Sequence, residues 1–92
     1  MEKFIAFIAQ HLVNFPDKVR VDKTDEADDR ERYLLFVEPS DRGKIIGRQG
    51  RTIKSFRILV GAVAARSGKR ASFDIFDDRP PSAKSRYNDS KK

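Results

Sequence analysis

Apolar and polar positions along this chain follow two different periods, which predict an order of helices and strands. Apolar residues recur at helical spacing from Phe4 to Leu12, so the sequence predicts a first helix over Glu2–Val13. Pro16 prevents that helix from continuing. Two valines then alternate with charged neighbours over Lys18–Asp22, a pattern typical of a short half-buried strand.

The middle of the chain predicts a second strand and a short helix. The stretch Thr24–Glu31 is dominated by acids and is expected to form an exposed loop that joins two strands. The run Arg32–Glu38 is rich in aromatic and branched apolar residues and stops at Pro39, which favours a central strand over a helix. Ser40 is expected to cap a short helix that begins at Asp41 and ends in a glycine turn.

The last part of the chain predicts a long helix and a closing strand. The helix is expected to begin at Arg51 and to end at Gly68. Arg70–Asp77 places alternate apolar residues on one face and is predicted as a strand. The order α-β-β-α-α-β indicates an α+β fold, and the chain of 92 residues is expected to form one domain over 1–77. The polar residues 78–92 are predicted to form a flexible basic tail.

The segment Ile45–Lys54 contains the candidate binding chemistry. Two apolar residues run into a Gly-x-x-Gly turn, and a basic amphipathic stretch leaves it. Gly47 and Gly50 carry no Cβ, so we expect the backbone of another chain, such as a nucleic-acid strand, to approach them closely. Arg48 and Gln49 between them are hydrogen-bond donors suited to phosphate oxygens. The turn therefore predicts a clamp for a negatively charged chain.

Charge supports this prediction. The chain has a formal net charge of +6, and residues 41–57 contain six basic residues against one acid. Arg51, Lys54 and Arg57 follow one another at a spacing of three, which places them along one side of the long helix. A basic helix face beside a glycine turn indicates a polyanion as partner.

Other classes of site are excluded by what the motifs lack. Lys44 is followed by Ile45 and not by the Ser or Thr of a P-loop, and no GxGxxG fingerprint is present. The chain has no cysteine and one histidine, His11, and its acidic stretch does not follow the calcium-loop pattern. We therefore expect no metal site, no cofactor and no enzymatic activity. The sequence also offers no secretory signal or membrane span, which predicts a cytoplasmic protein that does not contact a membrane.

The run Ile46–Ile53 resembles the signature of the KH family of single-stranded RNA-binding domains, and Val37–Lys54 is similar to the small bacterial single-KH proteins of the KhpA type. The resemblance covers about residues 1–77. It implies a type II KH domain with a three-stranded sheet packed by helices on one face, and RNA binding without chemistry. It also implies association with itself or with a second KH protein of the KhpB (Jag) type.

In the KH mode the loop clamps about four nucleotides by their backbone while the bases lie in a narrow aliphatic groove. We expect the strand Leu34–Val37 to help form the floor of that groove, and we expect a role as an RNA chaperone or post-transcriptional regulator. The predicted RNA-binding residues are Lys44, Ile45, Ile46, Gly47, Arg48, Gln49, Gly50, Arg51, Ile53 and Lys54.

Two alternatives remain open at the level of sequence. The chain could serve mainly as an interaction module that pairs with another KH protein, with RNA contact secondary, if the first helix exposes apolar surface. Single-stranded DNA could replace RNA, because nothing in the sequence distinguishes the two nucleic acids. Most phenylalanines are expected to pack in the core and not to stack on bases. These are Phe4, Phe7, Phe36, Phe56, Phe73 and Phe76.

Overall fold

The structure, a computed structural model, describes residues 1–77 and shows the predicted order of elements. The predicted tail, 78–92, lies outside the described residues. Three short 3₁₀ turns, Pro16–Lys18, Pro39–Asp41 and Arg48–Gly50, lie between the main elements. The helices and strands are α1 (Glu2–Gln10), β1 (Arg20–Ala27), β2 (Arg30–Phe36), α2 (Arg42–Ile46), α3 (Arg51–Arg66) and β3 (Arg70–Ile75).

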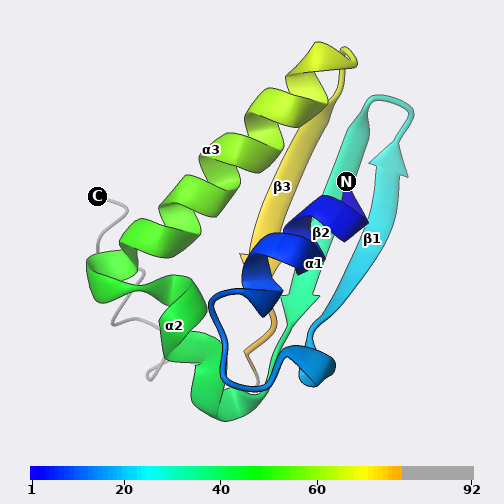
Figure 1. The fold of residues 1–92 in the computed structure, drawn as a ribbon. Coiled ribbons are helices and arrows are strands. Elements are labelled where there is room, and N and C mark those ends of the chain that lie inside the picture. Colours follow the sequence, from blue (N-terminus) through cyan, green and yellow to red (C-terminus); the bar gives the residue numbers. More distant parts are fainter. Residues whose placement is uncertain (78–92) are drawn as a thin grey trace.

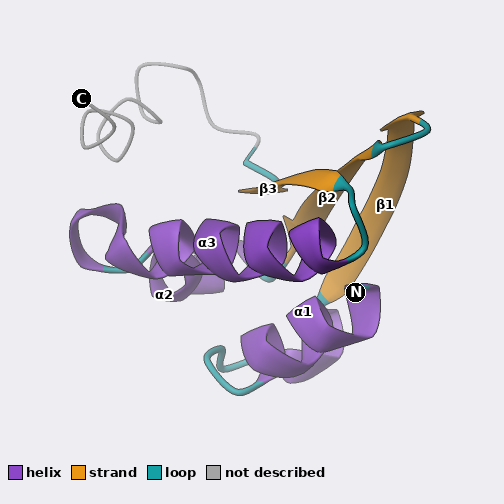
Figure 2. Cartoon of the chain, turned by 90° about the horizontal axis from the view of Figure 1, so that it is seen from above, coloured by secondary structure: helices purple, strands orange, loops and turns teal. Residues whose placement is uncertain are grey.

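The three strands form one mixed sheet in the order β1-β2-β3. β1 and β2 pair antiparallel, whereas β2 and β3 pair parallel, with α2 and α3 forming the crossover between them. All three helices lie on one face of the sheet (Figures 1 and 2). The predicted α+β class, with a three-stranded sheet covered by helices on one face, is therefore confirmed.

The hydrophobic core fills the space between the helices and that face of the sheet. It takes alternate residues from β2 and β3, because successive side chains of a strand point to opposite faces. The remaining core residues come from the inward stripes of the helices. The core members are Ile5, Ala9, Tyr33, Leu35, Ile45, Ile46, Ile53, Phe56, Val60, Phe73 and Ile75.

The long helix ends as predicted. Gly68 has φ +71°, a conformation that glycine adopts without the cost of a Cβ. Its N–H donates to the Ala65 carbonyl at 3.0 Å, and the N–H of Lys69 donates to the Ala64 carbonyl at 3.0 Å. This pair of hydrogen bonds reverses the chain and directs it into β3.

The prediction of a loop over Thr24–Glu31 is wrong. β1 continues to Ala27 and β2 begins at Arg30, so the acidic segment forms the end of a hairpin with a bulge between Asp25 and Ala27. Charge pairing explains the difference in part, because Lys23 of β1 lies 3.2 Å from the carboxylate of Glu31 on β2 and offsets the two acids, Asp25 and Glu31, that face each other across the hairpin. A pattern of charges read along one strand does not reveal this cross-strand pairing.

Glu31 is the centre of that pairing. Its side chain is almost fully buried, accepts a hydrogen bond from the Tyr33 hydroxyl at 2.8 Å, and lies 3.2 Å from both Lys23 Nζ and Lys69 Nζ. The hydrogen bond from Tyr33, followed by that from Lys69, lowers the pKa of Glu31 to about 2. Burial and the neighbouring carboxylate raise the pKa of Tyr33. The carboxylate thus links β1, β2 and Lys69, the residue that precedes β3, on the helix-facing side.

The first helix ends earlier than predicted, at Gln10 and not at Val13. The backbone N–H groups of Asn14 and Phe15 donate to the buried carboxylate of Asp41, at 3.2 and 3.0 Å, so this segment has partners outside a helix. Ser40 is exposed and does not cap α2, contrary to the prediction; Asp41 occupies the N-cap position.

The expected burial of the phenylalanines is correct for only two of the six. Phe56 and Phe73 are buried and stack at a centroid distance of 5.0 Å. Phe36 and Phe76 stack on each other at the end of the open face of the sheet, where the exposed fraction of Phe76 is 39%. The remaining two, Phe4 and Phe7 of α1, are exposed.

Candidate nucleic-acid interface

The turn between α2 and α3 consists of residues in unusual backbone conformations. Gly47 ends α2 with φ +76° and ψ 173°, and Gly50 precedes α3 with φ +74°. Gln49 lies between them with φ +57°, the one positive φ of a non-glycine residue within 1–77. The N–H of Gly50 donates to the Gly47 carbonyl at 3.1 Å, which closes the turn. A sharp, internally bonded turn therefore presents residues 48 and 49.

Gly47 is required by the protein itself. A Cβ built on this residue would lie 2.7 Å from the Thr52 Cβ and 2.9 Å from the Thr52 backbone nitrogen. The backbone angles of Gly47 also fall in a region that is essentially restricted to glycine. The sequence predicts that the missing Cβ of Gly47 lets the backbone of another chain approach. The structure adds that the missing Cβ also makes room for Thr52 in the first turn of α3.

The predicted polar contacts come together around this turn. Arg48 and Gln49 are exposed at its tip, and Lys44, Arg51 and Lys54 are exposed on the helices that flank it. The Arg51 guanidinium donates to the Gln49 side-chain oxygen at 3.3 Å, which orients both side chains. Four cations on two helices and one turn form a positive surface that suits phosphate groups.

The predicted apolar contacts lie below that surface. Ile45 and Ile53 expose 0% and 1% of their surface, and Ile46 exposes 8%. They anchor the turn to the core from both sides, so Ile45 and Ile53 do not present surface to a bound chain. They hold the turn in place, and the nucleotide contacts expected of them from the sequence stay a prediction.

The strand beside α3 is β3 and not β2. Leu34–Val37 belongs to the end of the central strand and the residue after it, whereas β3 forms the sheet edge along which α3 lies (Figure 1). Leu35 is fully buried within this segment. Leu34–Val37 therefore lies one strand further from α3 than β3 does, because the sequence order does not reveal that β3 adds next to β2 on the side of α3. Its place in the floor of a groove stays a prediction.

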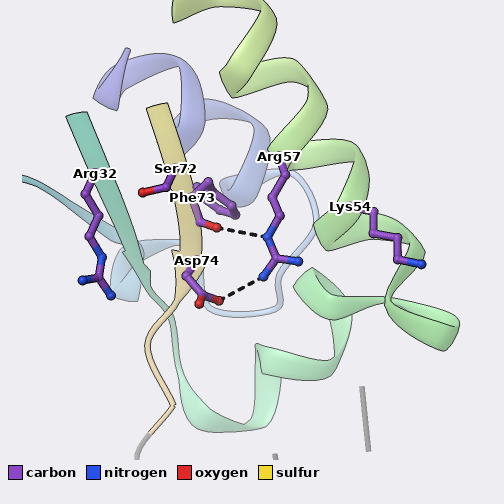
Figure 3. A pocket seen from close by; sticks show the side chains of 6 residues that line it. All are labelled: Arg32, Lys54, Arg57, Ser72, Phe73 and Asp74. Carbon is purple, nitrogen blue, oxygen red and sulfur yellow. Dashed lines mark hydrogen bonds and ion pairs between the residues drawn. The ribbon is translucent and has the colours of Figure 1, made fainter. Parts of the chain in front are cut away.

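A cavity of about 540 Å³ opens at this edge. Figure 3 shows Arg57 of α3 directed at β3. Its Nε donates to the Phe73 carbonyl at 3.2 Å and its Nη2 to the Asp74 carboxylate at 3.4 Å. The lining residues are Arg32, Lys54, Arg57, Ser72, Phe73 and Asp74.

The sequence prediction of the site missed most of this cavity. The spacing of Arg51, Lys54 and Arg57 already placed Arg57 on the basic side of the helix. Nothing in the sequence places Arg32 or Asp74 near it, because they lie on other strands. The cavity continues the positive surface of the turn along the edge of β3.

Two other features are absent from residues 1–77. No cluster of three or more histidine, aspartate or glutamate side chains there has the arrangement of a metal site. No helix in that range is both long and apolar enough to cross a membrane.

Comparison with known proteins supplies the family context for this surface. A family described as "KhpA/KhpB, KH domain" matches residues 2–75. The chain is 43% identical over 77 residues to the RNA-binding protein KhpA of Bacillus subtilis, which covers 84% of this chain and 94% of that protein. It is 40% identical over 79 residues to the RNA-binding protein KhpA of Chlamydia pneumoniae, covering 86% and 100%. The corresponding protein of Halalkalibacterium halodurans is 42% identical over 77 residues, covering 84% and 100%.

Proposed function

The chain belongs to the KhpA/KhpB family of KH domains, and from that premise we propose that it binds single-stranded RNA through the Gly47–Gly50 turn. The observation that carries the proposal is the exposed pair Arg48 and Gln49 on a turn fixed from below by buried isoleucines. A turn whose backbone is already fixed loses little conformational entropy when it binds phosphates, and this smaller cost increases the affinity.

The proposed mode of binding has two parts. The donors of the turn, together with Lys44, Arg51 and Lys54, hold the phosphate backbone, while Gly47 and Gly50 keep the tip free of Cβ atoms. The bases of about four nucleotides lie between α3 and the edge of β3, where the cavity opens. Ile45, Ile46 and Ile53 support this surface from the core.

A short clamp of this kind gives modest affinity, so we include self-association in the proposal. α3 exposes Ile58, Leu59 and Val63, with exposed fractions of 71%, 44% and 40%. Leu59 lies about 200° around the helix from Arg57, so this apolar surface extends away from the groove. A second copy of the chain pairing through α3 would bring a second clamp to the same RNA at raised effective concentration.

The biological role proposed for this binding is that of an RNA chaperone or post-transcriptional regulator in the cytoplasm. A second KH protein of the KhpB (Jag) type is the alternative partner for the exposed face of α3. Membership of the KhpA/KhpB family and the positive surface of the turn support this role and this partner, and the binding involves no chemical step.

The test replaces the donors at the tip of the turn by acids. The double variant Arg48→Asp/Gln49→Asp should bind single-stranded RNA at least about tenfold more weakly, because two anions then face the phosphates. Folding should be preserved, since both positions are exposed and aspartate tolerates the positive φ of residue 49. The matched control is Lys3→Asp/Gln10→Asp, which makes the same change of net charge at exposed positions of α1.

Fluorescence anisotropy with labelled RNA measures both variants. A folded turn variant that binds RNA as tightly as the parent would show that the turn is not the clamp. Equal losses in the turn variant and in the control would assign the effect to net charge and contradict the proposal. Titration of the same nucleotide sequence as DNA separates RNA binding from the single-stranded DNA alternative.

A further inference from the structure

The face of the sheet opposite the helices carries arginines that the turn does not use. Tyr33 and Leu35 of β2 are buried under the helices, so the residues that alternate with them point to the open face. Arg30 and Arg32 occupy such positions. In the parallel register Arg30 lies opposite Arg70 of β3.

This arrangement places like charges together without compensation from acids. Cross-strand neighbours of the same charge destabilise a sheet. No ion pair within residues 1–77 involves Arg30, Arg32 or Arg70. The two acids on the same face, Asp22 and Asp74, are engaged by Arg20 and Arg57. The three arginines therefore form an unneutralised group, the open-face arginines.

The cavity at the edge of β3 connects this group to the clamp. Lys54 and Arg57 of α3 line it on one side, and Arg32 and Ser72 line it from the sheet. Figure 3 shows Arg57 reaching β3 from α3, while Arg32 and Ser72 lie on the other side of that strand. The positive surface thus continues around the edge strand and does not end at α3.

The distances suit a polynucleotide. Residues 74 to 70 of β3 span about 13 Å at about 3.3 Å per residue. That length accommodates at least two successive phosphates of an extended single strand. The exposed guanidinium groups of Arg30 and Arg70 present forked donors that match phosphate oxygens.

We propose that an RNA strand held by the turn continues across the edge of β3, past Arg32, onto the open face, where Arg30 and Arg70 bind its phosphates. The inference rests on the proposed function and lengthens its site beyond the clamp. The hairpin turn that contains Asp28 and Asp29 limits this surface, since carboxylates repel phosphates. RNA long enough to reach the open face should bind more tightly than RNA that fills the clamp alone.

The experiment compares two lengths of RNA on three variants of the full chain. Oligonucleotides of about five nucleotides fill the clamp, and those of about twelve also reach the open face. The test variant is Arg30→Gln/Arg70→Gln, which leaves Arg32 intact because Arg32 lines the cavity of the clamp. The control, Lys3→Gln/Lys18→Gln, removes the same charge from exposed positions outside both surfaces. The turn variant Arg48→Asp/Gln49→Asp reports separately on the clamp.

For the test variant we expect the affinity for the long RNA to fall about three- to tenfold and its logarithmic salt slope to shrink by about 1.4, the value for two lost phosphate contacts. Binding of the short RNA should stay within about twofold, as should both RNAs on the control. Thermal denaturation should show an unchanged or higher midpoint, because the cross-strand repulsion is relieved.

Two results would overturn the inference. Unchanged affinity of the test variant for the long RNA would leave the open face free for another partner, such as an acidic protein. An equal loss for short and long RNA would mean that these arginines act only through net charge. Either result leaves the proposed function standing if the turn variant has lost binding to both lengths. Failure of the turn variant to weaken the short RNA contradicts the proposed function itself.

Discussion

The buried carboxylate of Asp41 accepts a hydrogen bond from the backbone N–H of Phe15 at 3.0 Å, across 26 positions of sequence. The same carboxylate accepts a second bond from the N–H of Asn14 at 3.2 Å. Asp41 also sits at the N-cap position of α2, the helix that leads into the Gly47 turn. One side chain therefore links the segment after α1 to the start of the candidate clamp.

The first prediction concerns this link. Asp41→Ala should destabilise the domain by about 1–3 kcal/mol, because two buried backbone donors lose their acceptor. Ser40→Ala is the matched control, and it should change stability by less than about 0.5 kcal/mol. Chemical denaturation followed by circular dichroism measures both. A loss of about 1 kcal/mol in Ser40→Ala would mean that Ser40 caps α2 after all.

The second prediction separates two glycines. Gly47→Ala should cost about 1–3 kcal/mol from backbone strain alone, with a further loss from the clash against Thr52. Gly43→Ala should be neutral or stabilising by up to about 1 kcal/mol, because Gly43 lies in α2 with nothing within 4 Å of an added Cβ. Thermal denaturation of the two variants tests this contrast, and equal midpoints would contradict it.

The third prediction is a dependence of stability on pH. The folded pKa of Glu31, about 2, lies below its ordinary value of 4.5, so the ionised form stabilises the fold. This contribution is fully present above about pH 5 and is lost as the pH falls from there through 2. Glu31→Gln should be less stable than the parent at pH 7 and should show a flatter profile below pH 5.

Denaturation at a series of pH values gives these profiles. Glu26→Gln, at an exposed position of β1, is the control and should keep the slope of the parent. Identical profiles for the parent and Glu31→Gln would show that the contacts of Glu31 contribute nothing to the acid dependence.

The fourth prediction concerns salt. If one clamp neutralises three or four phosphates, the logarithm of the RNA affinity should fall with the logarithm of salt concentration with a slope of about −2 to −3. A short RNA keeps this measurement separate from Arg30 and Arg70 of the open face. Deletion of residues 79–92 should change the slope by less than about one unit if the tail only aids solubility. An affinity independent of salt would mean that the basic surface is not the binding surface.

The fifth prediction concerns self-association. The exposed apolar surface of α3 should make the protein a dimer at micromolar concentration, and Ile58→Glu should convert it to the 10.6 kDa monomer without unfolding it. Phe7→Glu is the control. Phe7 is also a large apolar residue with most of its surface exposed, but it lies on α1 and packs on His11 at a centroid distance of 4.5 Å.

Analytical ultracentrifugation over a range of concentrations distinguishes the outcomes. A parent protein that stays at 10.6 kDa would refute the dimer. Dissociation by Phe7→Glu, with none by Ile58→Glu, would move the interface to α1.

The sequence by itself determined the order of elements and the chemistry of the turn. Helical spacing of apolar residues, the strand run before Pro39 and the glycine at 68 are local signals, and each acts through its immediate neighbours. The Gly-x-x-Gly turn with its cations is equally local, so the exposure of Arg48 and Gln49 could be predicted from the sequence. What an isolated segment prefers can be inferred without the rest of the chain.

Only the tertiary structure decided which distant residues meet. The acidic segment became part of a hairpin because Glu31 finds Tyr33 and two lysines, and α1 ended early because Asp41 accepts the following N–H groups. Ile45, Ile46 and Ile53 lie in the hydrophobic core, where they anchor the turn from both sides. The edge of β3 became the neighbour of α3 through the parallel crossover. Each outcome depends on a partner far away in sequence, and pairing across such distances leaves no periodic signal along the chain.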